Sequence, residues 1–180
     1  RLIAASFLYA TFYLRLCSVI GYNLVMVRVL FVCLGNICRS PMAEFVFRHK
    51  VDLAGLSDKI EVASAGTGDE EEGNRVHRGT ARILDRLNID YSSKRAARIN
   101  AHDAAKYDYI IAMDAANVRD LRYMGIDSVK LLEYCGDDSN ISDPWYTGNF
   151  DKTFEDVDRG TDALLTYIRN KHFLKGNSGD

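Results

Sequence analysis

The sequence predicts an α/β fold, a single domain of three layers (α/β/α) with a four-stranded parallel sheet between the helices. Apolar runs rich in β-branched residues alternate along the chain with longer segments whose apolar residues have helical spacing, which is typical of a parallel sheet covered on both faces. The chain has 180 residues and no repeats, linkers or low-complexity segments. It therefore fits one domain with a sizeable core.

Residues 1–25 are predicted to be an N-terminal extension that the fold does not need, ahead of a domain over residues 26–175 and a frayed end over residues 176–180. The uncharged stretch 2–14 stops at Arg15, short of the roughly 18 apolar residues needed to cross a bilayer. It also lacks the clear cationic start and small-residue cleavage site of a secretory signal. An apolar tail that associates with a membrane is the alternative.

The first strand is expected over residues 27–32, and the turn that follows it, Cys33–Pro41, leads into a segment with helical spacing from Met42. Pro41 stands where the first helical residue is expected, because its missing N–H costs nothing there. In α/β proteins ligands bind at such a turn, at the carboxyl end of a strand. We therefore expect a phosphate-binding loop after the first strand.

The residue types in this turn suit a tetrahedral anion. Backbone N–H groups of the turn and free amides of the next helix face one small volume, and the guanidinium of Arg39 can bind two anion oxygens without any metal or other cofactor. Such a field favours the thiolate form of Cys33, which is the nucleophilic form of a cysteine. The other residues predicted to bind the anion are Leu34, Gly35, Asn36, Ile37, Cys38 and Ser40.

The remaining elements follow from the same two periodicities, 2 for strands and 3.6 for helices. Strands are expected over residues 59–63, 107–113 and 128–132. Helices are expected over residues 41–54, 76–88, 115–123 and 153–173. Gly55 is expected to end the first helix, and Asp114 to cap the third.

Two polar segments between these elements are interpreted as solvated, and one histidine is assigned to a helix terminus or to the surface. Asp69–Glu72 is an acidic loop without the alternating spacing of a calcium site. His77 lies near a helix start and is interpreted as a helix-terminus or surface residue, with an acid or base role as the alternative. The basic segment Lys94–Arg98 is interpreted as a solvated face, with salt bridges or a minor substrate contact as the alternatives.

Composition excludes several classes of protein. Charged residues make up 27% and hydrophobic residues 47%, and the net charge of −2 gives no general attraction to nucleic acid or anionic membranes. The cysteines have neither zinc-ligand spacing nor the density of a secreted disulfide scaffold. A reducing cytoplasm is therefore the expected location. The four cysteines are Cys17, Cys33, Cys38 and Cys135.

The spacing Cys-x5-Arg from Cys33 to Arg39, followed by Ser40, is shared by the cysteine-dependent phosphatases. The fuller string, Cys-Leu-Gly-Asn-Ile-Cys-Arg-Ser-Pro after a buried strand, resembles one family among them, the low-molecular-weight protein tyrosine phosphatases. The resemblance implies a monomeric phosphatase domain over residues 26–175 that hydrolyses protein phosphotyrosine and small aryl phosphates through a cysteinyl-phosphate. Cys33 would then be the nucleophile and Arg39 the phosphate-binding cation.

The segment around Asp143 would supply the proton that this reaction needs. Pro144 forces Asp143 out of helical geometry and stiffens its loop, so that the carboxyl group is presented. Taken alone the pair would be a simple turn. The resemblance instead implies that Asp143 acts as general acid and then as general base, and that Trp145 and Tyr146 form a wall of the substrate cleft.

The resemblance assigns further roles at the edge of the site. Ser64 would hydrogen-bond Asn36 and hold the loop in shape. Asp114, in the string Ala-Met-Asp-x-x-Asn, would either orient neighbouring side chains or only cap its helix. Glu70 falls where the family usually has an aromatic cleft-wall residue, which suggests a preference for basic sequences around the phosphate. Cys38 would either form a reversible disulfide with Cys33 or pack under the loop.

Three alternatives stay open. Arsenate reductases share the loop but need two further cysteines, whereas only Cys135 lies downstream. Protein-arginine phosphatases of the same fold typically carry Thr where this chain has Ile37, which favours phosphotyrosine. The third is a non-catalytic module that binds oxyanions or senses redox state, which the presence of Cys33, Arg39 and Asp143 disfavours.

Overall fold

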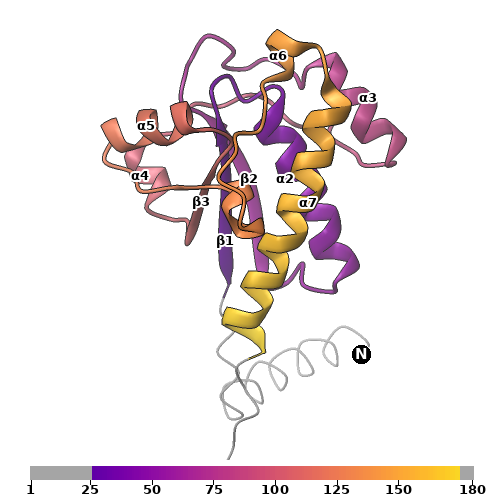
Figure 1. The fold of residues 1–180 in the computed structure, drawn as a ribbon, viewed down its shortest axis with the longest axis vertical. Helices are drawn as coiled ribbons and strands as arrows, with labels where there is room; N and C mark the ends of the chain where they lie inside the picture. The colour runs from indigo at the N-terminus through magenta and orange to yellow at the C-terminus, as the bar shows by residue number, and fades with distance from the viewer. Residues whose placement is uncertain (1–25, 175–180) are drawn as a thin grey trace, which may run out of the picture.

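Four parallel strands form the middle layer in the order β2-β1-β3-β4 (Figure 1). The computed structural model describes residues 26–174, so the predictions for 1–25 and for 176–180 lie outside the described residues. The predicted α/β fold with a four-stranded parallel sheet is confirmed. The strands are β1 (Val27–Cys33), β2 (Ile60–Gly66), β3 (Tyr109–Ala112) and β4 (Val129–Lys130).

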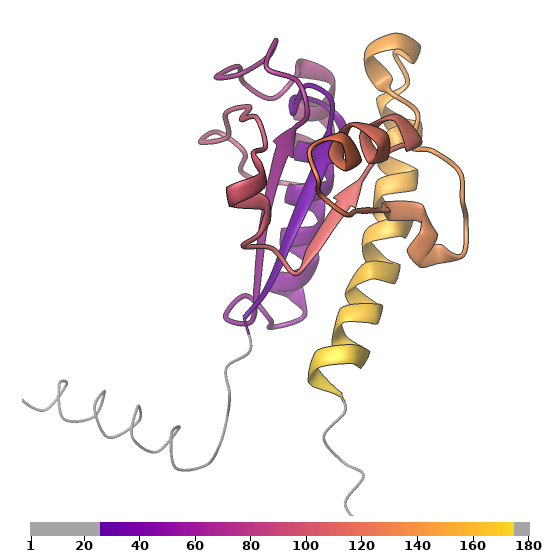
Figure 2. The ribbon, with the colours of Figure 1, turned by 90° about the vertical axis from the view of Figure 1, so that its left-hand side faces the viewer.

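Helices cover both faces of this sheet. On one face, α2 and α7 pack against each other and α3 packs on both, while α4 and α5 lie on the other face (Figures 1 and 2). Within residues 26–174, none of the helices combines the length and apolar character needed to span a bilayer. The helices are α2 (Arg39–Leu53), α3 (Arg78–Arg86), α4 (Ala101–Ala104), α5 (Ala115–Tyr123), α6 (Pro144–Thr147) and α7 (Phe150–Ile168).

The central strand β1 divides its side chains between two hydrophobic clusters. Val29 and Phe31 lie in the larger cluster under α2 and α7, whereas Leu30 and Val32 lie in the smaller cluster beside α5. This alternation is the period of two that a strand imposes, and both faces are buried as expected for a parallel sheet. The carboxyl end of β1 is thereby fixed from both sides, and that end carries the predicted site.

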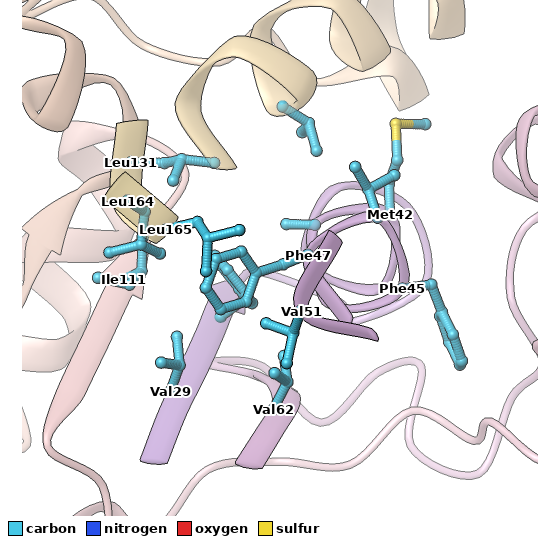
Figure 3. Packing of buried hydrophobic residues seen from close by; sticks show 14 of the residues in the cluster. Val29, Met42, Phe45, Phe47, Val51, Val62, Ile111, Leu131, Leu164 and Leu165 are labelled. Atoms are coloured by element: carbon cyan, nitrogen blue, oxygen red, sulfur yellow. The ribbon is translucent and has the colours of Figure 1, made fainter. Parts of the chain in front are cut away.

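Helix α2 holds the larger cluster together through Phe47. Figure 3 shows the Phe47 ring in the middle of the labelled side chains, between the strands and Leu165 of α7. The ring meets Phe31 edge to face, with 5.5 Å between the ring centroids. Phe45 points away from this group in the same view, and the guanidinium of Arg48 lies over it. Burial of Phe47 therefore anchors the helix that follows the phosphate-binding loop.

The boundaries of several predicted elements need correction. Helix α2 begins at Arg39, so Pro41 lies within the first turn rather than at the first position. The predicted strand over residues 128–132 is only two residues long, and a 3₁₀ helix, η1 (Leu131–Cys135), follows it. Leu131 and Leu132 are both buried in the cluster beneath α7, which a strand with alternating faces could not achieve. Helix α7 begins at Phe150, and a π-helical turn, η2 (Arg169–Phe173), ends it.

Candidate active site

The loop between β1 and α2 turns its carbonyl groups outward and leaves its amides free. In residues 26–174, no backbone N–H from Leu34 to Arg39 donates a hydrogen bond to a protein acceptor. These donors are therefore available for an anion above the loop. Four carbonyls of this segment, by contrast, accept hydrogen bonds from residues outside it. The Cys33 carbonyl accepts from Thr67 N–H, and the Leu34 carbonyl accepts from Gly68 N–H. The Ile37 carbonyl accepts from His77 N–H, and the Cys38 carbonyl accepts from the Thr80 hydroxyl.

Asn36 maintains the shape of this loop. Its backbone is left-handed, with φ of 54°, which asparagine tolerates better than most residues. Its amide Nδ2 donates to Ser40 Oγ at 2.9 Å and to Ser64 Oγ at 2.8 Å, and its Oδ1 accepts from Ala97 N–H at 3.0 Å. The structure thus contains the hydrogen bond between Asn36 and Ser64 that the family resemblance implied.

Cys33 lies at the floor of a cleft with a volume of about 290 Å³. Its side chain is only 3% exposed, and its sulfur lies 3.0 Å from Ser40 Oγ. Most of the predicted site residues line this cleft, whereas Asn36, Ser40, Ser64 and Asp114 lie behind the lining. The lining residues are Cys33, Leu34, Gly35, Ile37, Cys38, Arg39, Glu70, Glu71, Asp143, Trp145 and Tyr146.

Arg39 is buried beside the cleft and held by carboxylates. Its Nη1 donates to Asp114 and, at 3.2 Å, to the Ile141 carbonyl, while its Nη2 donates to Asp143 Oδ2 at 2.6 Å. Its Nε is buried without a hydrogen-bond partner among the described residues. Burial acts to lower the pKa of Arg39, but the charges of Cys33, Asp114 and Asp143 outweigh it and raise the pKa. The guanidinium therefore stays cationic and offers a free donor.

Each of the two predicted aspartates, Asp114 and Asp143, makes two contacts. Asp114 caps α5 by accepting from Asn117 N–H at 2.7 Å, and its other oxygen binds Arg39. Asp114 therefore both caps its helix and orients a neighbouring side chain, the two alternatives that the sequence left open. Asp143 caps α6 by accepting from Trp145 N–H at 3.0 Å, with its other oxygen on Arg39. Both carboxyl groups thus reach the same guanidinium from separate loops.

A buried ion pair supports the loop from below, and the sequence did not predict it. Glu44 of α2 is buried and accepts from Ser64 Oγ at 2.6 Å, from Lys94 Nζ at 2.9 Å and from Arg48 at 2.5 Å. Lys94 also donates to the Ser64 carbonyl at 2.9 Å. Its side chain is only 12% exposed, so the interpretation of Lys94 as part of a solvated face is wrong. The salt-bridge alternative holds instead, because Glu44 needs a partner when buried.

His77 is the helix-terminus residue that the sequence suggested. Its Nδ1 accepts from Gly79 N–H at 3.1 Å and so caps α3. Its ring stacks on Phe150, with 5.1 Å between centroids and an interplanar angle of 4°, and it meets Trp145 edge to face. Because the His77 N–H also binds the Ile37 carbonyl, this residue connects the phosphate-binding loop to the cleft wall.

Cys38 is a buried free thiol, as is Cys33. It packs with Ile37 and Ala96, as the packing alternative proposed. Burial, followed by the charges of Cys33 and Asp143, raises the pKa of Cys38 to about 12. The Cys38 thiol is therefore protonated at neutral pH.

Glu71 is a cleft residue that the sequence did not single out. It lines the cleft together with Glu70, and a Cβ at Gly35 would lie 3.0 Å from its Cγ. The only signal was its place beside Glu70 in the acidic segment. In the described part of the chain, this segment and its neighbours form no cluster of His, Cys, Asp and Glu suited to hold a metal ion.

Comparison with known proteins agrees with this geometry. Residues 28–174 match the sequence model of a family described as low molecular weight phosphotyrosine protein phosphatase. The Bacillus subtilis low molecular weight protein-tyrosine-phosphatase YfkJ is 43% identical over 156 residues, which cover 83% of this chain and 100% of YfkJ. The crystal structure of YfkJ, at 42% identity, has a TM-score of 0.80 and covers 84% of this chain and 99% of that chain.

Two further solved structures share the fold. The low molecular weight protein tyrosine phosphatase of Streptococcus pyogenes is 38% identical with a TM-score of 0.72, covering 84% of this chain and 99% of that chain. A Drosophila arginine phosphatase is 29% identical with a TM-score of 0.73, and the match covers 78% of this chain and 97% of that chain. The family match extends over residues 28–174, and the similarity to YfkJ covers 83% of the chain. The chain therefore belongs to the low molecular weight phosphotyrosine protein phosphatase family.

Proposed function

We propose that this chain hydrolyses protein phosphotyrosine, and small aryl phosphates, through a cysteinyl-phosphate intermediate and without a metal. The observation that carries the proposal is the position of the Cys33 sulfur at the floor of a loop with free amides. Beside it lies Arg39 Nε, which has no hydrogen-bond partner in the part of the chain that the structure describes. This arrangement suits a tetrahedral dianion above a nucleophile.

In the first step, the Cys33 thiolate attacks phosphorus and the bond to the phenolic oxygen breaks. The loop amides and Arg39 bind the equatorial oxygens, on which charge is spread in the transition state. The incoming phosphate competes with Asp143 for Arg39 Nη2 and frees that carboxyl group. Asp143, protonated at that moment, gives its proton to the leaving phenolate as general acid.

In the second step, water attacks the cysteinyl-phosphate and the S–P bond breaks. Asp143, now ionised, takes a proton from the attacking water as general base. Ser40 Oγ, 3.0 Å from the sulfur, donates a hydrogen bond to the thiolate as it leaves. Asn36 and Ser64 act as positioning residues, because they hold Ser40 and the loop rather than the substrate.

Side chains at the mouth of the cleft would receive the aromatic ring of the substrate. Trp145 is 57% exposed and Tyr146 is 79% exposed, so both offer apolar surface to an incoming ring. Leu34 and Ile37 add aliphatic surface to the lining. This lining supports phosphotyrosine as the substrate. Glu70 and Glu71 are the exceptions, because they place carboxylates in the cleft lining.

The test of this proposal is hydrolysis of p-nitrophenyl phosphate by the wild type and by Cys33→Ser, with and without a chelator. We expect turnover that chelation does not change, and none in Cys33→Ser, which should still bind phosphate. Rapid quenching should trap phosphate on Cys33 and not on Cys38. Turnover that survives in Cys33→Ser would disprove the mechanism.

Phosphoarginine is the second candidate substrate. The carboxylates of Glu70 and Glu71 in the cleft lining could bind a guanidinium leaving group, and one structural neighbour is described as an arginine phosphatase. Rates on phosphotyrosine and phosphoarginine versions of one peptide would separate the two. We expect the phosphotyrosine peptide to be the better substrate because of the aromatic and aliphatic lining.

We also propose a cellular location and the bounds of the active domain. The free thiols of Cys33 and Cys38 suit a reducing cytoplasm. The domain over residues 26–175 should act without residues 1–25, since the family match begins at residue 28 and YfkJ is covered over its full length. A chain that starts at Met26 should therefore keep its activity on p-nitrophenyl phosphate within about twofold, which is a small change in activation free energy.

A further inference from the structure

A second groove lies directly beside the catalytic cleft. It runs between α3 and the segment that joins α6 to α7, and its two parts have volumes of about 400 Å³ and 310 Å³. Gly79, Arg82 and Phe150 line both parts, so they form one continuous groove. Trp145 lines the groove on one side and the catalytic cleft on the other. A ligand that fills the cleft therefore has the groove as its immediate neighbour.

The walls of this groove are held in place by close packing. A Cβ at Gly79 would overlap the ring of Phe150, so glycine lets that ring lie directly against α3. The Phe150 ring stacks on His77, and His77 in turn meets Trp145 and binds the Ile37 carbonyl of the phosphate-binding loop. The position of the groove relative to the catalytic cleft is therefore fixed by direct contacts between side chains.

The groove is cationic at the end nearest the cleft. Arg78, Arg82 and Arg86 follow one another at intervals of four residues, so they share a face of α3. Arg86, at the far end, pairs with Asp151 at 2.5 Å. Arg78 and Arg82 form no ion pair and no side-chain hydrogen bond with any residue in the described part of the chain. Burial, followed by the charges of Arg78 and Arg82, lowers the pKa of His77, so both charges act at the Trp145 end.

We infer that this groove binds an anionic side chain of the same substrate whose phosphotyrosine occupies the cleft, through the guanidinium groups of Arg78 and Arg82. The inference rests on the proposed function. The anion is a carboxylate or a second phosphate, since either accepts the paired donors of a guanidinium. In an extended peptide, side chains two residues apart lie roughly 7 Å apart on one face. The anionic residue therefore lies within about three positions of the phosphotyrosine.

The test compares phosphotyrosine peptides that differ at one position at a time, within three residues on either side of the phosphotyrosine. The residue at that position is Ala, Asp or phosphoserine, so the arms separate a carboxylate from a phosphate without adding a second phosphotyrosine substrate. We expect at least one position at which the wild type prefers the anionic peptide by about tenfold in kcat/KM. Arg78→Gln/Arg82→Gln should lose that preference. Added salt should weaken it in the wild type and leave the variant unchanged.

Arg119→Gln/Arg122→Gln is the matched control, because it removes the same charge from exposed arginines of α5 on the opposite face of the sheet. It should keep the wild-type preference. Equal losses in the two double variants would mean a long-range effect of net charge and would overturn the inference. Equal loss on the Ala and anionic peptides in Arg78→Gln/Arg82→Gln would mean a structural role for these arginines and would overturn it as well.

Binding to Cys33→Ser provides a readout that needs no turnover. Trp145 is the single tryptophan of the chain and lies between cleft and groove, so its emission reports occupancy. In the Cys33→Ser background, the dissociation constant should be about tenfold lower for the anionic than for the Ala peptide, and this ratio should vanish with Arg78→Gln/Arg82→Gln. A ratio near one in Cys33→Ser would refute the groove assignment. Failure of the wild type on p-nitrophenyl phosphate would instead refute the proposed function.

Discussion

The carboxylate of Asp143 lies on the guanidinium of Arg39, with Oδ2 accepting from Nη2 at 2.6 Å. Arg39 begins α2 and Asp143 caps α6, so the two groups lie 104 residues apart in sequence. A substrate phosphate needs the same guanidinium donors, so it competes with Asp143 and releases the carboxyl group toward the leaving oxygen. The ion pair therefore keeps the proposed acid at the cleft until substrate arrives.

Substitution Asp143→Ala should affect poor leaving groups most. We expect kcat to fall roughly 100-fold for phenyl phosphate, a typical loss for a missing general acid, and much less for p-nitrophenyl phosphate, whose leaving group needs little protonation. Inhibition by inorganic phosphate should become stronger, because Arg39 loses a competing anion. Steady-state kinetics with a series of substituted phenyl phosphates measures both effects. The same loss across the series would argue against an acid role for Asp143.

Substitution Asp114→Ser should separate the two contacts of this residue. Serine can still cap α5 but cannot reach Arg39 as a carboxylate does, so the helix is preserved while the guanidinium loses an anchor. We expect kcat/KM to fall about 10- to 100-fold, as displaced binding groups typically cause, with little change in the thermal midpoint. Asp114→Ala is the control that also loses the cap, at about 1 kcal/mol. Full activity in Asp114→Ser would show that the contact with Arg39 is dispensable.

Local patterns were sufficient to predict much of this site. The loop Cys33–Pro41 lies between a strand and a helix, and its amides, thiol and guanidinium are adjacent in sequence. Asp143 was assigned through the family resemblance, because its pair with Pro144 taken alone would be a simple turn. The burial of Glu44 could not be predicted, because its partners Ser64 and Lys94 are 20 and 50 residues away and only tertiary packing brings them together. Its acidic side chain in an otherwise apolar helix turn was the one available signal.

The pairing of Glu44 with Lys94 should contribute to stability. Lys94→Met should lower the free energy of unfolding by about 2 kcal/mol, less than a fully unpaired buried charge would cost, because Arg48 still binds Glu44. Urea unfolding measures this loss. Arg95→Met is the control, since the Arg95 side chain is exposed and binds only backbone carbonyls. A double-mutant cycle with Glu44→Gln should give a coupling energy above about 0.5 kcal/mol, and additive effects would contradict the pairing.

Cys38 should make the protein less stable at high pH. Its pKa is raised to about 12 in the fold from an ordinary value of 9.0, so between these values the unfolded chain releases a proton that the folded chain retains. The contribution of Cys38 to the free energy of unfolding is therefore fully present below pH 9. It declines as the pH rises, by up to about 1.4 kcal/mol per pH unit. Urea unfolding from pH 8 to pH 10.5 should show a steeper decline in the wild type than in Cys38→Ala. Parallel declines would mean that Cys38 does not titrate in this way.

The carboxylate of Glu70 lines the cleft, and it should select substrates with basic residues around the phosphotyrosine. Glu70→Gln should lower kcat/KM for a phosphotyrosine peptide with flanking arginines by about threefold, in keeping with one exposed charge pair. The same change should leave p-nitrophenyl phosphate unaffected or slightly faster, because a carboxylate near the phosphate dianion is removed. Glu72→Gln is the matched control, since Glu72 is exposed in the same segment but does not line the cleft. If Glu70→Gln changes both substrates by the same factor, or if Glu72→Gln has the same effect, Glu70 does not select the sequence around the phosphate.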